Sequence, residues 1–513
     1  MSHEFLENYQ YDGCVARGIC SIGPITSALQ STLIMYLKFI AKYIDKIEEK
    51  GVQYEKLKSL VLNLLPISVS YPEFTESSFM LALYEFHNVI NAFDNKVEVY
   101  AAGKKLFEAT SDIVNSIRYG ERVFLRAQER LSLQVRDLYN IMLVIAKSLA
   151  VNLLDLESFG KSSDNAFKYI INILNEINLE EKNIENLKTF IFNASKIDNK
   201  LMFEIRNAQE NCYGKQREVE VSFSTVPSKA VLVVGSNIKE LENVLENLKN
   251  TSIDVYTHDD MMLAHTFPKF TEYVNLKGQF GQGVENCLLD FATFPGPIIL
   301  TKHSLHNIDN LYRGILFTTD FTCPKGVVRI IDNDFSQVIK LAQESKGFKT
   351  GKQCEEILVG CDYLKKIEEI KSKLMNYKKL VMIAIDGYSL EQKVYFEKLL
   401  KNLPEDVLVV SFSYESTKEN VIYLNTCYDA FGLIKVFEEI KDLVPSITIF
   451  IPRCDKNSVS QMVYLKSHEN TTVFVGKCTP IILNPSLMQT FQDEFSINAI
   501  TSAKKDLDII LKN

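Results

Sequence analysis

Residues 230–256 read AVLVVGSNIKELENVLENLKNTSIDVY. The apolar run Ala230–Val234 ends in Gly235 and is typical of a buried strand. Apolar residues then recur at the three- and four-residue spacing of a helix, at Leu241, Val244, Leu245 and Leu248. A second strand-like run, Ile253–Tyr256, follows. Strand, helix and strand in this order predict a right-handed crossover within a parallel sheet.

The same alternation continues downstream in two groups. Further runs typical of buried strands are Pro297–Leu300, Ile315–Thr318 and Val327–Ile331. Beyond the lysine-rich stretch Gly347–Lys352, helical patterns such as Val394–Leu400 alternate with four more runs, Leu380–Ile385, Val407–Phe412, Ile447–Ile451 and Thr472–Val475. We therefore predict two doubly wound, Rossmann-like parallel-sheet domains, at residues 223–365 and 366–513.

The amino-terminal part of the chain has a different pattern of apolar residues. Pro24 marks a helix start, and apolar residues follow it at helical spacing as far as Ile44. Similar patterns cover Phe79–Phe93, Ile113–Leu133 and Ala166–Ile177. An N-terminal helical bundle over residues 1–222 is the prediction, so the whole chain is expected to be an α/β multidomain protein.

Composition narrows the classes of function. The chain has 513 residues and a net charge of −8, which disfavours a sequence-independent nucleic-acid binder because such a protein needs a cationic surface. The first ten residues show no signal peptide, and the apolar window Leu138–Leu156 is broken by Lys147 and Asp155 and is too short for a membrane span. Ten cysteines in such a chain are expected to be reduced thiols, and we expect a cytoplasmic protein.

Polar residues directly follow the predicted strands. They are Ser236, His258–Asp260, His303, Ser304, Asp386, Ser413, Tyr414 and Asp455. Ligands of open parallel sheets bind beyond the carboxyl ends of the strands, so these side chains predict a polar crevice. Capping of the following helices is the simpler interpretation, and residue types alone favour it.

Several of these segments resemble one family. The segment Gly235–Leu241 together with Asp254–His258 is similar to hybrid-cluster proteins, also called prismane proteins or hydroxylamine reductases. Further matching stretches are Ala264-His265, Phe294–Ile298, Gly13-Cys14, Gly18–Cys20, Ala28–Gln30, Asp386-Gly387, Asp429-Ala430 and Pro485–Leu487. The resemblance implies a helical domain and two α/β domains, a cubane iron–sulfur cluster bound by cysteines near the amino terminus, and an inner hybrid cluster ligated by His, Glu and Cys. It also implies reduction of hydroxylamine or nitric oxide.

Most positions that the resemblance assigns to the inner cluster carry other residues here. The histidine ligand corresponds to Ser236, the first glutamate to Asp260 and the last glutamate to Asp455. The four cysteine ligands correspond to Ser304, Ile385, Ser413 and the retained Cys427.

These replacements remove soft donors. Iron–sulfur centres are held by thiolates, whereas a serine hydroxyl is a poor ligand and isoleucine has no lone pair. We therefore expect a degenerate member that lacks the hybrid cluster and its reductase activity, with a crevice suited to a small polar ligand or a hard cation. The alternative is an active oxidoreductase with an altered metal centre that uses Asp260, Cys427 and Asp455, with His258 as a further ligand.

The amino-terminal cluster is also incomplete. Cys14 and Cys20 are present, but no cysteine precedes them, and the next in the chain is Cys212. Two thiolates do not complete a four-cysteine cubane, so a cluster there would be shared between the two chains of a homodimer. The other interpretation is that both are small buried residues.

Four arginines repeat every four residues within one predicted helix, at Arg118, Arg122, Arg126 and Arg130. A stripe of this kind is usually a solvated face paired with local acids, here Glu121 and Glu129, and we prefer that interpretation. The alternative is docking of an acidic partner, such as a ferredoxin-like electron donor. Nucleic acid and membrane are not expected as partners.

Overall fold

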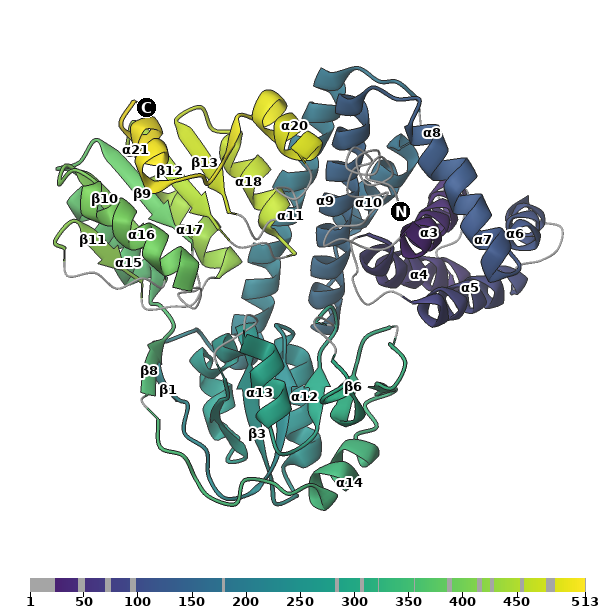
Figure 1. Ribbon diagram of the computed structural model, residues 1–513, viewed down its shortest axis with the longest axis horizontal. Helices are drawn as coiled ribbons and strands as arrows, with labels where there is room; N and C mark the ends of the chain where they lie inside the picture. Colours follow the sequence, from purple (N-terminus) through teal and green to yellow (C-terminus); the bar gives the residue numbers. More distant parts are fainter. Residues whose placement is uncertain are drawn as a thin grey trace, which may run out of the picture. The chain divides into compact units, whose positions relative to one another are not determined.

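The computed structural model describes residues 24–44, 51–69, 75–92, 98–177, 180–281, 286–304, 309–321, 323–354, 356–384, 390–412, 418–424, 429–452, 456–476 and 485–512 (Figure 1). The chain divides into two compact units. One contains residues 1–202, 454–467 and 477–497, and the other contains residues 203–453, 468–476 and 498–513. The three-domain division expected from the sequence stays a prediction.

The first unit is helical, as predicted for the amino-terminal region. Its elements are α3 (Pro24–Ile44), α4 (Val52–Ser68), α5 (Glu76–Asn91), α6 (Glu98–Ala109), α7 (Ile113–Tyr119), the π-helix η1 (Gly120–Leu125), α8 (Arg126–Gln128), α9 (Leu133–Ser158), α10 (Asp164–Glu176) and most of α11 (Ile184–Tyr213). Two later helices, α18 (Ser458–Lys466) and α20 (Pro485–Phe495), also belong to this unit. Their grouping with the bundle is not apparent from sequence periodicity.

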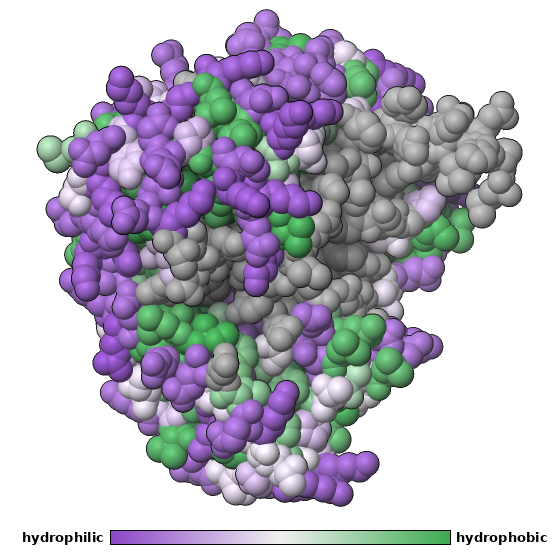
Figure 2. Space-filling view, turned by 60° about the vertical axis from the view of Figure 1, so that its left-hand side comes forward, coloured by the Kyte–Doolittle hydropathy of each residue, from purple (hydrophilic) through white to green (hydrophobic). Residues whose placement is uncertain are grey.

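Helix α9 is a buried helix of the first unit. Contrary to the expectation from Leu138–Leu156, it is long and apolar enough to cross a membrane, the one such helix among the described residues, but 83% of its apolar window is buried inside the protein. Burial of this degree is the environment of a core helix. In the view of Figure 2, hydrophilic residues cover most of the described surface, and hydrophobic residues lie among them in small groups.

The first sheet has six parallel strands in the order β4-β3-β2-β5-β6-β7. Their bounds are β2 (Lys229–Val234), β3 (Ile253–His258), β4 (Leu276–Gln279), β5 (Ile298–Leu300), β6 (Leu316–Thr318) and β7 (Val328–Arg329), with α12 (Ile238–Leu248), α13 (Cys287–Thr293) and α14 (Ser336–Glu344) between them. Numbered from β2, this is the doubly wound order 3-2-1-4-5-6. Strand β4 was not predicted, because its sequence LKGQ has no apolar run.

The second sheet repeats this order, as β11-β10-β9-β12-β13-β14. Its strands are β9 (Lys379–Ile383), β10 (Val407–Ser411), β11 (Val421–Tyr423), β12 (Ser446–Ile451), β13 (Thr471–Val475) and β14 (Ile497–Ala499), and its helices include α15 (Tyr363–Leu374), α16 (Leu390–Asn402), α17 (Ala430–Ile440) and α21 (Ala503–Lys512). The predicted pair of doubly wound sheets is therefore confirmed. A separate two-stranded ribbon, β1 (Val219–Ser222) with β8 (Glu356–Val359), is antiparallel.

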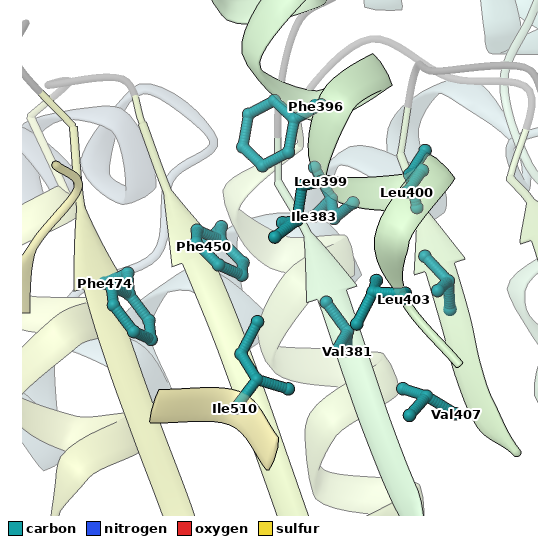
Figure 3. Close-up of a cluster of buried hydrophobic side chains, with 11 residues drawn as sticks. Val381, Ile383, Phe396, Leu399, Leu400, Leu403, Val407, Phe450, Phe474 and Ile510 are labelled. Atoms are coloured by element: carbon teal, nitrogen blue, oxygen red, sulfur yellow. The ribbon is translucent and has the colours of Figure 1, made fainter. Parts of the chain in front are cut away.

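A continuous apolar core stabilises the second sheet. Residues of α16 and α21 pack on its strands, including Phe396, Leu399 and Ile510 (Figure 3). Phe450 and Phe474 stack on neighbouring strands with their ring centroids 4.8 Å apart. Burying such side chains contributes roughly 1.5–3 kcal/mol each to the stability of this layer.

Candidate functional site

The doubly wound order defines a switch point in each sheet, where chain connections leave in opposite directions. In the first sheet it lies between β2 and β5, which pair through Leu232↔Ile298 and Val234↔Leu300. Ligands of such sheets bind outside the carboxyl ends of these two strands. The residues that follow β2 and β5 are the predicted positions Ser236 and Ser304, so this part of the predicted crevice lies at the switch point.

Gly235 allows the loops after β2 and β5 to come close together. Its φ is +122°, and a Cβ at this position would lie 2.0 Å from Ser304 Oγ and 2.2 Å from Thr301 Oγ1. A side chain at residue 235 would meet both hydroxyls and adopt a strained backbone conformation. The glycine in the family-like segment therefore has a local structural reason.

The Ser304 side chain faces inward. It is 5% exposed, and its Oγ lies 3.2 Å from Thr301 Oγ1 within hydrogen-bond reach. Thr301 Oγ1 also donates to the carbonyl oxygen of Val234 at 2.8 Å, which ties this hydroxyl pair to the end of β2. Ser236, by contrast, is exposed. Both predicted positions thus lie beyond the carboxyl ends of neighbouring strands. The Ser304 side chain is buried, whereas the Ser236 side chain faces solvent.

Two buried carboxylates position the loop after β5. Glu240, in the first turn of α12, accepts the backbone N–H of Lys302 at 2.9 Å and the hydroxyl of Thr319 at 2.5 Å. Asp320 accepts the backbone N–H of His303 at 2.9 Å. His303 adopts a φ of +62°, which is uncommon for a residue with a side chain. The backbone N–H groups of Lys302 and His303 donate to Glu240 and Asp320, and these hydrogen bonds hold the backbone in that conformation.

Burial raises the pKa of Glu240, and the Lys302 charge and the bonds from Thr319 and the Lys302 backbone oppose the shift. Sequence reasoning missed this carboxylate. The available signal was its helical spacing, because Glu240 lies four and eight residues before the buried Val244 and Leu248. Glu240 acts on the loop backbone, so its role is structural.

A second polar group follows β3. His258 is fully buried, its Nε2 lies 3.0 Å from Oδ2 of Asp290, and its ring packs edge-on against Phe291. Within the described part of the chain, its Nδ1 has no hydrogen-bond partner. Asp260 lies in the following 3₁₀ helix η2 (Asp259–Thr266) and is half-buried.

The neighbouring His265 is uncharged near neutral pH. Burial lowers its pKa to about 4, and its Nε2 lies 2.8 Å from Oγ1 of Thr257. Thr257 Oγ1 also lies 2.6 Å from Oε1 of Gln279, to which it donates a hydrogen bond. Thr257, His265 and Gln279 therefore form a hydrogen-bonded polar cluster at the end of β3. Gln279 belongs to β4, the strand that the sequence did not predict.

The remaining predicted ligands lie outside the described residues. They are Cys14, Cys20, Ile385, Ser413, Cys427 and Asp455. In the chain, Ile385 follows β9 and Asp455 follows β12, the two strands at the switch point of the second sheet. Among the residues that the structure describes, no group of three or more His, Cys, Asp or Glu side chains could hold a metal ion.

Two of the described cysteines, Cys323 and Cys361, do not offer thiolates near pH 7. Cys212, Cys323, Cys354 and Cys361 are free thiols. Burial raises the pKa of Cys323 to about 11 and that of Cys361 to about 12, so both stay protonated. A protonated thiol is a poor metal ligand, since binding requires the thiolate.

Comparison with known proteins gives one family. The family model for the Prismane/CO dehydrogenase family matches residues 8–421. Curated relatives named hydroxylamine reductase include those of Methanocella arvoryzae (23% identical, covering 98% of both chains), Clostridium perfringens (22%, 97% of both) and Methanococcus vannielii (24%, 100% of both).

One solved structure also aligns along most of the chain. It is that of the alpha subunits of acetyl-CoA synthase/carbon monoxide dehydrogenase with NiZn[Fe4S4] and NiNi[Fe4S4] clusters. Its TM-score is 0.49 at 13% identity, over 98% of this chain and 85% of that one.

Proposed function

Because the chain belongs to the prismane/CO dehydrogenase family, we propose that it is a hydroxylamine reductase homologue that has lost the inner hybrid cluster. With that cluster it would also have lost reduction of hydroxylamine and nitric oxide. In this proposal the chain is a cytoplasmic pseudoenzyme that keeps the family's scaffold. The oxygen-lined edge of its first sheet would suit a small polar ligand or a hard cation.

The observation that carries the proposal is the environment of the Ser304 hydroxyl. At this position the resemblance implies a cysteine whose thiolate faces iron, whereas the Ser304 hydroxyl is buried against Thr301 and the end of β2. A hydroxyl already within hydrogen-bond reach of a neighbour is a still poorer iron donor than a free one. The exposed Ser236 supplies no imidazole, so the described residues do not fit a hybrid cluster.

The other positions support the same conclusion by residue type. Ile385 has no donor atom, and Ser413 replaces a second thiolate. Asp260 and Asp455 have side chains one methylene shorter than glutamate, so their oxygens would not reach an unchanged iron position. Cys427 alone retains a soft donor, and one thiolate does not hold a multi-iron centre.

An active oxidoreductase with an altered metal centre is the second candidate. Near-complete coverage of relatives named hydroxylamine reductase favours it, as does the arrangement of His258. An imidazole whose one nitrogen contacts a carboxylate, here Asp290, is typical of histidines that bind a metal through the other nitrogen. In that case His258 would join Asp260, Cys427 and Asp455.

Iron and acid-labile sulfide in anaerobically purified protein distinguish the two candidates. The wild type is compared with Cys14→Ser/Cys20→Ser, because a cluster shared between two chains through these cysteines would contribute iron of its own. Hydroxylamine reduction is assayed in parallel with reduced methyl viologen as the electron donor.

The proposal predicts no hydroxylamine turnover, and no iron or sulfide in the double variant. Iron and sulfide that persist in the double variant, together with turnover, would establish the altered metal centre instead. Iron that is present in the wild type and absent from the double variant would assign it to the amino-terminal cysteines and leave the inner site empty, as proposed.

A further inference from the structure

A row of four arginines lies along the rod formed by α7, η1 and α8 and continues into the turn that follows it, where Arg130 lies. Arg118, Arg122, Arg126 and Arg130 are all exposed. The buried residues of the same rod recur with the same four-residue period, at Ser116, Gly120, Phe124 and Gln128. The two rows alternate along the sequence, so the arginines occupy the solvent face opposite the packed face.

The π-helix keeps the arginines in line. In an α-helix, residues four apart overshoot a full turn of 3.6 residues, so a stripe with this spacing drifts around the rod. A π-helix has wider turns with i→i+5 hydrogen bonds, so the same spacing falls short of a full turn. Because η1 (Gly120–Leu125) lies in the middle of the row, its shortfall opposes the overshoot of the flanking α-helical turns. The arginines therefore stay closer to one line along the rod.

The rod is fixed against α3. A Cβ at Gly120 would lie 2.0 Å from the carbonyl oxygen of Ala28, so the two helices approach too closely for any other residue. The hydroxyl of Thr32 donates to the carbonyl oxygen of Ser116 at 2.7 Å. Asp112 caps the start of α7 by accepting the backbone N–H of Asn115 at 2.9 Å. The arginines therefore project from a rigid support.

The arginines form the solvated face expected from the sequence, but the expected ion pairs with Glu121 and Glu129 are not formed. Among the described residues, none of the four arginines forms an ion pair or a side-chain hydrogen bond, although Glu121 and Glu129 are exposed on the same rod. Like charges four residues apart destabilise a helix, and the rod contains two such pairs in succession, Arg118 with Arg122 and Arg122 with Arg126. The row thus carries an internal electrostatic cost, and no described acid forms an ion pair with it.

We propose that this arginine row is the docking surface for an acidic protein that presents several carboxylates. Planar guanidinium groups suit carboxylates because they donate in a fixed fork. A nucleic acid fits less well, since the chain as a whole carries a charge of −8 and Glu121 and Glu129 flank the row. The docking surface does not depend on the fate of the inner cluster, so it holds for either function above.

The test measures binding of a strongly acidic bacterial ferredoxin, used as the probe, to the full chain by fluorescence anisotropy. The variant Arg122→Glu/Arg126→Glu is compared with Lys398→Glu/Lys401→Glu, which makes the same change of net charge on exposed lysines of α16. We expect the arginine variant to weaken binding by about tenfold or more, because it sets like charges against each other at the contact. The lysine variant should stay within about twofold of the wild type, and raising the salt from about 50 to about 200 mM should weaken wild-type binding.

Equal weakening by both variants would overturn the proposal, because it would show a dependence on net charge alone. Absence of ferredoxin binding, or binding through the arginines to phosphatidylserine vesicles or duplex DNA instead, would also overturn it. The variant Arg122→Lys/Arg126→Lys keeps the charge and loses the planar fork, so it should bind more weakly than the wild type and more tightly than the glutamate variant. Unchanged thermal unfolding would show that each variant is folded.

Discussion

Arg206, near the end of α11, and Asp429, at the start of α17, form a buried ion pair. The Nη2 atom of Arg206 lies 3.1 and 3.0 Å from the two carboxylate oxygens, and the two side chains are 8% and 7% exposed. Tyr363 donates its hydroxyl to Asp429 at 3.1 Å, and the Arg206 guanidinium stacks 4.6 Å from the centre of the Phe431 ring. Asp429 also caps α17 by accepting the backbone N–H of Phe431.

Breaking this pair should destabilise the protein strongly. We expect Arg206→Met to lower the free energy of unfolding by about 3–5 kcal/mol, because it leaves a buried carboxylate without its cation. Asp429→Asn removes the charge but keeps a good cap, so Arg206→Met/Asp429→Asn should be more stable than Arg206→Met. Urea unfolding of the three variants and the wild type measures the coupling. If the double variant is no more stable than Arg206→Met, the pair is not what the arginine stabilises.

We predict that the helical unit loses stability as the pH rises, because it buries the carboxyl groups of Asp198 and Asp137. Burial raises the pKa of Asp198 to about 6, against the opposing hydrogen bonds of Ser148, Ser460 and Asn152 and the charge of Lys456. Burial likewise raises the pKa of Asp137 to about 6, opposed by Thr490, Arg136 and Ser486. The ordinary value is 3.8, so the folded state holds these protons more tightly than the unfolded state. Their contribution to the free energy of unfolding is complete below about pH 4 and is lost as the pH rises through about 6.

The size of this effect can be measured on Asp198. A shift of two pKa units corresponds to on the order of 2–3 kcal/mol, so Asp198→Asn should flatten the fall in stability between about pH 4 and about pH 7 by that amount. The comparison is urea unfolding across this range, with Asp508→Asn, at an exposed position of α21, as the control. A variant with the slope of the wild type would show that Asp198 does not carry the dependence.

Gly120 should not tolerate a side chain. An added Cβ would meet the backbone of α3, so we expect Gly120→Ala to destabilise the protein by about 1–3 kcal/mol, as overpacking does. Nothing lies within 4 Å of a Cβ built on Gly314, so Gly314→Ala is the matched control and should have little effect. Thermal unfolding of both variants is sufficient. Equal melting temperatures would contradict the close approach of η1 to α3.

Glu240 should protect the loop that carries Ser304. In Glu240→Ala, the N–H of Lys302 and the hydroxyl of Thr319 lose their acceptor. We therefore expect faster hydrogen exchange at the Lys302 amide and a loss of about 1–3 kcal/mol in stability. Glu246→Ala, on the exposed side of the same helix, is the control. Unchanged exchange at Lys302 would show that other contacts hold the loop.

Apolar periodicity predicted most of the fold. It predicted the strands on either side of both switch points, because these central strands are buried on both faces and have long apolar runs. It missed β4, β11 and β14, which are short edge strands, and β8 of the separate ribbon, and it could not show that α18 and α20 belong with the bundle. Such grouping depends on contacts between distant segments, such as the hydrogen bond from Thr490 to Asp137.

The sequence predicted which residues lie at the site, but not how their side chains are arranged. The polar residues after the strands indicated where Ser236 and Ser304 lie, and the structure places both at the switch point. The inward direction of Ser304, the support from Glu240 and the pair of His258 with Asp290 depend on packing between strands and helices. The Arg206–Asp429 pair joins residues 223 positions apart, a separation at which sequence spacing carries no signal.

Anomalous scattering at the iron edge, from crystals of anaerobically purified protein, tests the central claim most directly. If the family's inner metal assembly has been lost, the anomalous difference map will show no iron beside Ser236, Asp260 and Ser304. A multi-iron peak at that sheet edge would contradict the account and make the chain a working metalloenzyme.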